Sequence, residues 1–393
     1  MTTASVPGSA VSRRSHHLVV YGILFALAVA AVPVLAVVGV RTLLDSRDGE
    51  VLNPVLDPAL PGYQALVSPS PTLAVLHLDP DGALVGVAVL ALAGEDTEGG
   101  SVLLIPPRTL ASVPQFGDFT LEYIQDLNGT DNTRSLVEFV LGLGLDEVVE
   151  VTDSDWAELV EPLGGLVVVN PDTLTSPDGS AAFPAGELVL EPALVGPFLS
   201  ILEPTENPLN RMLRQELVWR ALLDALAEEP GAMRFAGEQD RGLARFLPAI
   251  AAGTSRLETL PIEPPAEVTA PGEVGSFSPD AEAIAGLIPQ LVPFPAGARP
   301  GDRPLVRVLD GSGRQWVIPP AVRQVAVAGG QVVMIGNTDE FGVADTQVLV
   351  ADAAFDSFAR SVADALGVGS VQRVDYIDEN AEVIVVLGTD YRP

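Results

Sequence analysis

The spacing of Arg211 and Arg214 is the feature of the sequence that most directly indicates a binding site. They lie three positions apart and Gln215 follows, so that on a helix the two arginines share one face. Two guanidinium groups on one face can hold a phosphate through paired hydrogen bonds. The alternative is a solvated helix face on which these arginines pair with Glu206 or Glu216. On these residues alone we favour the solvated face, because a spacing of three residues is not specific for phosphate binding.

Asp79 and Asp81 form a second polar pair, in the stretch Asp-Pro-Asp-Gly. Two carboxylates at this spacing could bind a hard cation through oxygen ligands. The same four residues also form an ordinary turn, because Asp side chains accept hydrogen bonds from nearby backbone amides, and we favour the turn. For His77 we expect a structural role, since a single His supplies neither a metal cage nor, without a placed partner, a base.

Composition excludes several classes of function. The chain has no Cys, which removes disulfides, thiolate zinc sites and Cys nucleophiles, and all 21 basic residues are Arg, which removes the Walker A loop. The net charge of −31 repels nucleic-acid phosphates, so no nucleic-acid partner is expected. The length of 393 residues predicts two or three domains, and the 48% hydrophobic content requires compact cores or a membrane segment.

A membrane span is predicted near the amino end. Residues 18–40 carry no charge and as a helix would extend about 35 Å, enough to cross a hydrocarbon core of about 30 Å. A cleaved signal peptide is the alternative, but its apolar part is usually shorter. Because Arg13 and Arg14 precede the span, residues 1–17 should form a cytoplasmic tail and the bulk of the chain should lie outside the cell membrane.

The remaining pattern alternates strands with helices. Apolar strand candidates lie at 73–78, 83–92 and 102–105, and helical periodicity is clearest at 133–141 and 210–226. This alternation predicts the α/β class, with a mixed sheet flanked by helices and a small carboxy-terminal α/β domain. Proline-rich stretches mark the boundaries. The predicted parts are an extended stalk at 41–71, a main domain at 72–260, a Pro-rich linker at 261–303 and the small domain at 304–393.

At this point the sequence resembles the LytR-CpsA-Psr (LCP) family of bacterial cell-wall proteins, with a LytR-type carboxy-terminal domain. The resemblance covers nearly the whole chain and rests on the order of its pieces. After the span and stalk come Leu104 to Thr109, similar to the family's Ile-Pro-Arg-Asp-Thr segment, and Asp155 to Gly165, similar to its Leu-Gly-Gly element. Arg211-x-x-Arg214-Gln215 resembles the arginine motif, and Val308 to Gly313 with Val386 to Asp390 resemble the carboxy-terminal domain.

The resemblance implies an extracellular phosphotransferase that moves a glycopolymer from a polyprenyl-pyrophosphate carrier to peptidoglycan. Arginines would bind the pyrophosphate, and Mg²⁺ would assist in neutralising its charge. This fits phosphoryl transfer, which depends on positioning and charge neutralisation. The implied partners are the membrane, a polyprenyl-phosphate lipid and peptidoglycan. For this chain, the resemblance implies that Arg108, Arg211 and Arg214 are the catalytic residues. It implies that Gln215, Asp79 and Asp81 bind the substrate. Arg214 is expected to matter most for binding, with little effect on stability.

This chain departs from the family pattern at several positions. Thr109 and Pro208 stand where the family has acids, and Phe198–Leu202 occupies the region of its paired arginines. Two hypotheses follow. The one we favour is an envelope protein that binds carrier-linked glycopolymer or wall with weakened or lost catalysis; the other is an active transferase with a rearranged site. A polyprenyl-phosphate lipid in the core of residues 72–260 would favour carrier binding.

Overall fold

The computed structural model describes residues 55–94, 97–113, 117–175, 181–203, 206–232, 240–263, 275–377 and 380–393. The predicted cytoplasmic tail, the span at 18–40 and the first part of the stalk lie outside these residues. Within the described part, no helix is long and apolar enough to cross a membrane.

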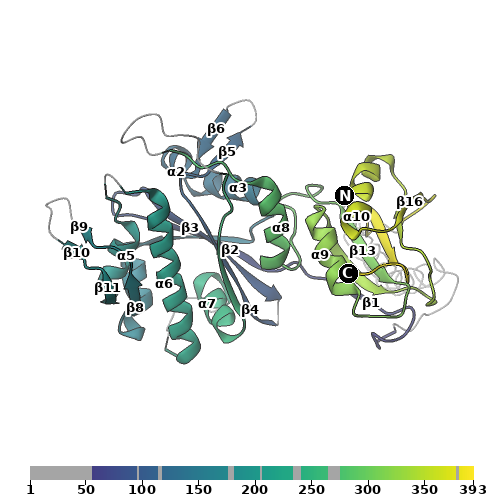
Figure 1. The fold of residues 1–393 in the computed structure, drawn as a ribbon, viewed down its shortest axis with the longest axis horizontal. Coiled ribbons are helices and arrows are strands. Elements are labelled where there is room, and N and C mark those ends of the chain that lie inside the picture. Colours follow the sequence, from purple (N-terminus) through teal and green to yellow (C-terminus); the bar gives the residue numbers. More distant parts are fainter. Residues whose placement is uncertain are drawn as a thin grey trace, which may run out of the picture. The chain divides into compact units, whose positions relative to one another are not determined.

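The first sheet has five strands in the order β12-β4-β3-β2-β7. Figure 1 labels β2, β3 and β4 of this sheet. β2 pairs antiparallel with β3 and β3 with β4, whereas β7 and β12 lie parallel to their neighbours. Its strands are β2 (Thr72–Leu78), β3 (Leu84–Gly94), β4 (Thr97–Ile105), β7 (Glu147–Thr152) and β12 (Ser255–Thr259).

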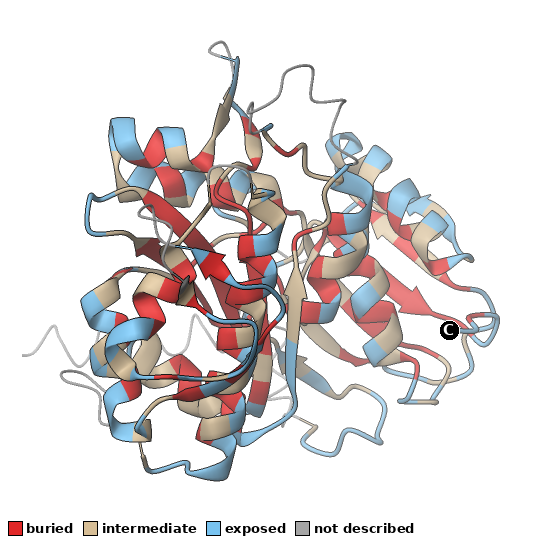
Figure 2. Cartoon of the chain, turned by 60° about the vertical axis from the view of Figure 1, so that its left-hand side comes forward, coloured by how far each residue is buried: buried red, intermediate tan, exposed pale blue. Residues whose placement is uncertain are grey.

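Both faces of this sheet are covered, as the red strands between helices show in Figure 2. Leu73 and Val75 of β2 belong to one core, and their neighbours Ala74 and Leu76 belong to the other. Two buried faces require a continuous apolar run, which is why these strands read as unbroken hydrophobic segments.

Helices and small strand pairs build the two layers. The first core is closed by α4 (Asp153–Val160), α5 (Pro192–Ser200), α6 (Pro208–Glu228), α7 (Gly242–Ala252) and the β8 (Leu166–Asn170) and β11 (Gly186–Leu190) pair. The second is closed by α2 (Leu121–Asn128), α3 (Thr130–Leu141) and α8 (Ala281–Leu291). Short elements are β5 (Leu110–Val113), β6 (Gly117–Thr120), η1 (Glu161–Leu163), β9 (Leu174–Thr175) and β10 (Ala181–Phe183).

The second sheet has six strands in the order β1-β14-β13-β17-β15-β16. Valines at alternate positions of the central strands pack under α9 and α10. The elements are β1 (Gln64–Leu66), β13 (Leu305–Asp310), α9 (Ile318–Val327), β14 (Gln331–Asn337), β15 (Gln347–Val350), η2 (Ala353–Phe355), α10 (Asp356–Leu366), β16 (Ser370–Arg373) and β17 (Val383–Leu387). The mixed α/β class predicted from the sequence is confirmed.

Two proline-rich segments, predicted as a stalk and a linker, contain elements that pack into the folded domains. Within the predicted stalk, β1 pairs antiparallel with β14, with Gln64 opposite Gly336. Within the predicted linker, α8 places Ile284, Ile288 and Leu291 in the second core. Isolated prolines stop regular hydrogen bonding at their own positions but leave the apolar stretches between them free to pack. The carboxy-terminal sheet therefore includes a strand that precedes the main domain.

The carboxy terminus is held in place by Tyr391. Its side chain is fully buried and its hydroxyl donates a hydrogen bond to Gln324 of α9. Burial raises the pKa of the Tyr391 phenol to about 12. The folded chain therefore keeps this phenol neutral at a pH where the unfolded chain ionises it.

We expect the stabilising effect of the neutral Tyr391 to be complete below about pH 10 and to be lost as pH rises towards about 12. Urea unfolding of the wild type and of Tyr391→Phe between these limits tests this, because phenylalanine cannot ionise. The substitution should cost about 0.5–1.5 kcal/mol at pH 8, through the lost hydrogen bond. Tyr376→Phe is the control, since Tyr376 is exposed. Equal pH dependence in all three proteins would contradict the assignment.

Candidate functional site

Helix α6 positions the arginine motif. Asn207 caps the helix by accepting a hydrogen bond from the Leu209 amide at 3.0 Å, and Pro208 occupies the first helical position. Proline is favoured there because its missing N–H would have no partner inside the helix. One stripe of α6 faces the interior and includes Arg211, Met212, Arg214, Gln215, Val218, Trp219, Leu222, Leu223 and Leu226. The arginine motif therefore does not lie on a solvated face.

Arg214 is neutralised within the fold. Its guanidinium forms a buried ion pair with Glu206 and donates a hydrogen bond to the Ile201 carbonyl. The Arg214 side chain is 3% exposed and that of Glu206 is 6% exposed. The pairing with Glu206 that the sequence left open is therefore present, in a buried setting, and the carboxylate already occupies the position that a bound anion would need.

Arg211 differs from Arg214 in having no such partner. It is buried, and its Nε has no hydrogen-bond partner; among the described residues no ion pair to its guanidinium is found. Burial lowers the pKa of Arg211, the charge of Glu122 raises it, and the nearby charge of Arg214 lowers it further. The charges of Glu206 and Asp79 also raise this pKa, but none of these carboxylates forms an ion pair with Arg211 among the described residues. A bound anion in direct contact would therefore stabilise the buried guanidinium further.

Arg108 forms an ion pair with Glu122, whose charge also acts on Arg211. It lies in the loop after β4, donates from Nε to the Gly275 carbonyl at 3.1 Å and pairs with Glu122 of α2 at 3.3 Å. Glu122 also acts on the charge of Arg211. The structure thus places Arg108, Arg211 and Glu122 in one region. Sequence reasoning missed Glu122, because it is one of many surface-type acids and only the fold brings it to the arginines.

Gln215 has a backbone partner rather than a free amide. Its Nε2 donates to the Val85 carbonyl of β3 at 2.8 Å, in a buried position. A Cβ atom at Gly86 would lie 2.9 Å from this nitrogen, so a side chain at this position would push the Gln215 amide aside. The observed contacts make Gln215 a link between α6 and the sheet.

Asp79 and Asp81 form the turn between β2 and β3. One oxygen of Asp79 accepts hydrogen bonds from the amides of Asp81 and Ala83, both at 2.9 Å, and Asp81 is exposed. The charge of Asp79 still reaches Arg211, whose pKa it raises. The described residues contain no group of three or more His, Cys, Asp or Glu that could hold a metal ion. These contacts make Asp79 a turn residue and Glu122 a partner of Arg108, and assistance by Mg²⁺ stays a prediction.

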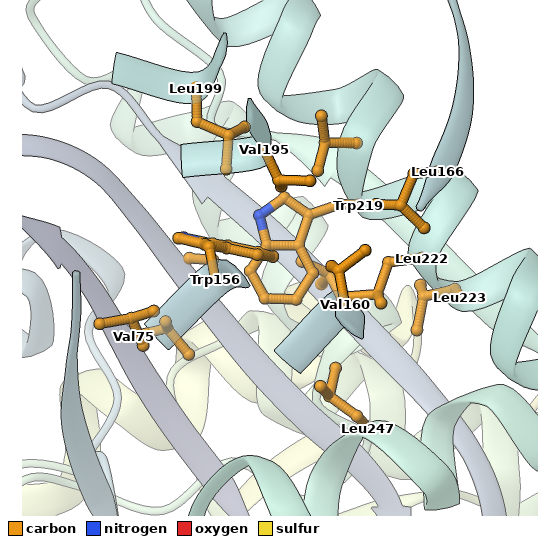
Figure 3. Close-up of a cluster of buried hydrophobic side chains, with 14 of the residues drawn as sticks. Val75, Trp156, Val160, Leu166, Val195, Leu199, Trp219, Leu222, Leu223 and Leu247 are labelled. Atoms are coloured by element: carbon orange, nitrogen blue, oxygen red, sulfur yellow. The ribbon is translucent and has the colours of Figure 1, made fainter. Parts of the chain in front are cut away.

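The core behind the motif is filled by aromatic side chains. Trp156 of α4 and Trp219 of α6 meet edge to face, 5.3 Å between ring centroids (Figure 3). His77 lies against Trp156 and, contrary to the premise that it has no placed partner, pairs with Asp153 at 2.9 Å; its structural role stays a prediction. The cavity beside His77 and Gln215 measures about 10 Å³, room for one water and far below the roughly 300–1,000 Å³ of a pocket for a drug-sized ligand.

Phe198–Leu202, the segment that the resemblance sets against the family's paired arginines, places Phe198 and Leu199 in this core. Phe198 and Leu199 of α5 are fully buried, and Phe198 packs edge to face on Phe183 with centroids 5.0 Å apart. Apolar side chains therefore take up this part of α5. An anion-binding role for Arg211 and Arg108 stays a prediction.

Comparison with known proteins identifies the carboxy-terminal domain. Residues 304–391 match the family model "LytR cell envelope-related transcriptional attenuator". The family resemblance drawn from the sequence is confirmed at this domain. No curated protein matches the chain.

Several solved structures are similar to part of the chain. TagT of B. subtilis is 18% identical, with a TM-score of 0.44, over 60% of this chain and 92% of TagT. B. subtilis TagV is 19% identical, with a TM-score of 0.45, over 57% of this chain and 96% of TagV. A LytR-Csp2A-Psr enzyme from Actinomyces oris is 16% identical, with a TM-score of 0.43, over 56% of this chain and 93% of the enzyme. TagT has also been solved with bound octaprenyl pyrophosphate lipid.

Proposed function

We propose, from the LytR-type domain at residues 304–391 and the arginine site of α6, that this chain is an LCP-like protein of cell-wall biogenesis. It binds a phosphate- or pyrophosphate-linked glycopolymer, and its transfer activity is weakened or lost. The proposal includes a single-pass membrane anchor at residues 18–40, with the folded part outside the cell.

One observation carries this proposal, the contrast between the two motif arginines. Arg211 is buried and forms no ion pair with the residues that the structure describes, whereas Arg214 pairs with Glu206. An unpaired buried guanidinium favours an anionic ligand. Arg214 is paired with Glu206, and α5 presents apolar side chains to the core. The described residues contain no group of three or more acids or His that could hold a metal ion. The charge neutralisation that phosphoryl transfer needs is therefore reduced. Binding is therefore supported better than catalysis.

Replacing Arg211 with Gln should weaken binding of octaprenyl pyrophosphate by at least about tenfold, since a charge-assisted hydrogen bond contributes roughly 1.5–3 kcal/mol. Titration of the full chain in detergent micelles, followed by intrinsic Trp fluorescence, measures the affinity. EDTA should leave it unchanged. Arg220→Gln is the matched control, because Arg220 lies on the same helix in an exposed pair with Glu216.

Two results would decide against the proposal. Equal affinities for Arg211→Gln, Arg220→Gln and the wild type would remove Arg211 from the site. Polymer transfer to peptidoglycan by the wild type, abolished in Arg211→Gln, would establish the active transferase instead. Protease treatment of intact spheroplasts tests the topology, since degradation of everything after residue 50 is expected and survival of the full chain would overturn it.

A further inference from the structure

A groove of about 250 Å³ lies at one edge of the carboxy-terminal sheet. β13 and β14 are parallel and connected through α9, so their carboxyl ends lie on the same edge. Ligands of open α/β sheets bind outside the carboxyl ends of the strands. The groove is separate from the arginine site of the main domain.

One wall is a loop held rigidly by a buried carboxylate. Asp310, fully buried at the end of β13, accepts hydrogen bonds from the amides of Ser312 at 2.7 Å, Gly313 at 3.1 Å and Gln315 at 2.9 Å. Among the described residues, Gln315 is the one non-glycine residue with a positive φ, +22°. Such a conformation persists where the surroundings over-determine it. Asp310 supplies that support, and Gln315 lines the groove.

The opposite wall comes from the segment before the main domain. Pro58 and Tyr63 line the groove. The side-chain amide of Asn337 donates to the carbonyls of Pro58 at 2.8 Å and Leu60 at 2.7 Å, and its backbone amide donates to Tyr63. Docking of β1 on β14 therefore completes the groove, which residues 304–393 alone would leave open on this side.

The chemistry of the lining selects a class of ligand. Ile318, Pro319 and the Tyr63 ring offer apolar surface, and the exposed Gln315 offers a side-chain amide, whereas the Asn337 amide nitrogen is engaged by Pro58 and Leu60. Among the described residues, no charged side chain lines the groove. Because no cationic side chain lines the groove among the described residues, an anionic group would find no counter-charge there. A sugar ring has an apolar C–H face and a rim of hydroxyls, so it matches both kinds of surface. The volume falls below the roughly 300–1,000 Å³ of drug-sized pockets and fits one ring.

A neighbouring aromatic side chain extends this surface. Trp316 follows Gln315 and is 59% exposed, with the Arg314 guanidinium 5.3 Å from its ring centroid. Arg314 is itself tied to the carbonyls of Gly388 and Tyr391. The Trp316 ring is therefore held against Arg314 at the surface, one residue along the chain from the groove residue Gln315, and its exposed face could contact a second unit of a glycan strand.

We propose that this groove binds an uncharged sugar ring within a glycan strand. Because it uses none of the anion-binding arginines, it is a second, independent site that would hold the carboxy-terminal domain on wall glycan. This goes beyond the proposed function, and either can fail without the other.

The test uses the full chain and chitotetraose, a neutral oligomer of N-acetylglucosamine, with binding followed by isothermal titration calorimetry. Tyr63→Ala and Gln315→Ala should each weaken binding about tenfold, a loss that corresponds to about 1.4 kcal/mol. Tyr376→Ala is the control, since Tyr376 is an exposed aromatic residue of the same domain outside the groove. Arg211→Gln should leave chitotetraose binding unchanged, which separates this site from the anion site.

Gly336→Val gives a second variant directed at the docking of β1. A Cβ atom at Gly336 would lie 2.2 Å from the Tyr63 carbonyl oxygen, so the substitution should displace β1 and abolish binding. Gly286→Ala in α8 is its control, because a Cβ there meets nothing within 4 Å. Absence of binding up to about 10 mM chitotetraose, unchanged binding in Tyr63→Ala, or binding of a proline-rich peptide in place of the sugar would each overturn the proposal.

Discussion

Replacing Arg214 with Ala should lower the free energy of unfolding by about 3–5 kcal/mol, because it leaves the carboxylate of Glu206 buried without its partner. Chemical denaturation of the full chain, followed by circular dichroism, measures this cost. The expectation reverses the one drawn from the sequence, in which this substitution changes binding and leaves stability almost untouched. The reason is the observed ion pair, which gives the guanidinium a structural partner.

A double-mutant cycle makes the test specific. Arg214→Met with Glu206→Leu removes both charges and should cost less than either single change, because no unpaired charge stays buried. Arg220→Ala is the matched control on the same helix; its pair with Glu216 is exposed and should contribute about 0–1 kcal/mol. Equal small effects of Arg214→Ala and Arg220→Ala would mean that the ion pair with Glu206 does not form in solution.

Replacing Trp219 with Ala should cost about 3–5 kcal/mol through lost packing and the cavity left behind. Trp219 is 4% exposed and packs on Trp156 in the first core. Urea unfolding measures the cost. A large apolar cavity should also allow the folded variant to bind a small apolar molecule such as benzene, which the wild type, with its cavity of about 10 Å³, should not bind.

Trp316→Ala is the control, since this ring is 59% exposed and its loss should change stability by about 0.5 kcal/mol or less. A cost near zero for Trp219→Ala would show that the core is loosely packed. In that case a carrier lipid could be accommodated between α6 and the sheet, and the transferase alternative would gain support.

Several features could be predicted because they depend on neighbouring residues. The strand at 73–78 and the helix at 210–226 appear as β2 and α6 with small differences at their ends, since apolar runs and periodicity are local signals. The turn at Asp79 follows from the hydrogen bonds that an Asp side chain makes to nearby amides. The LytR-type domain could be recognised from short motifs in order.

The site could be predicted only in part. Placing Arg211 and Arg214 on one helix follows from their spacing, but their different environments do not. Glu206 lies eight residues before Arg214 and reaches it because the chain turns into α6 at Asn207. Glu122 reaches Arg108 because α2 packs beside the loop after β4. Neither contact has a periodic signature in the sequence.

The sequence by itself determined the class of the fold, the identity of the carboxy-terminal domain and which arginines to examine, because composition, periodicity and motif order are properties of short stretches. Only the tertiary structure decided which arginine keeps an unpaired charge, that Trp156 and Trp219 fill the core, and that β1 joins a sheet formed some 270 residues later. These outcomes depend on side chains meeting across the fold. The burial and pairing of a charge are set by such long-range neighbours, whose identity no local pattern contains.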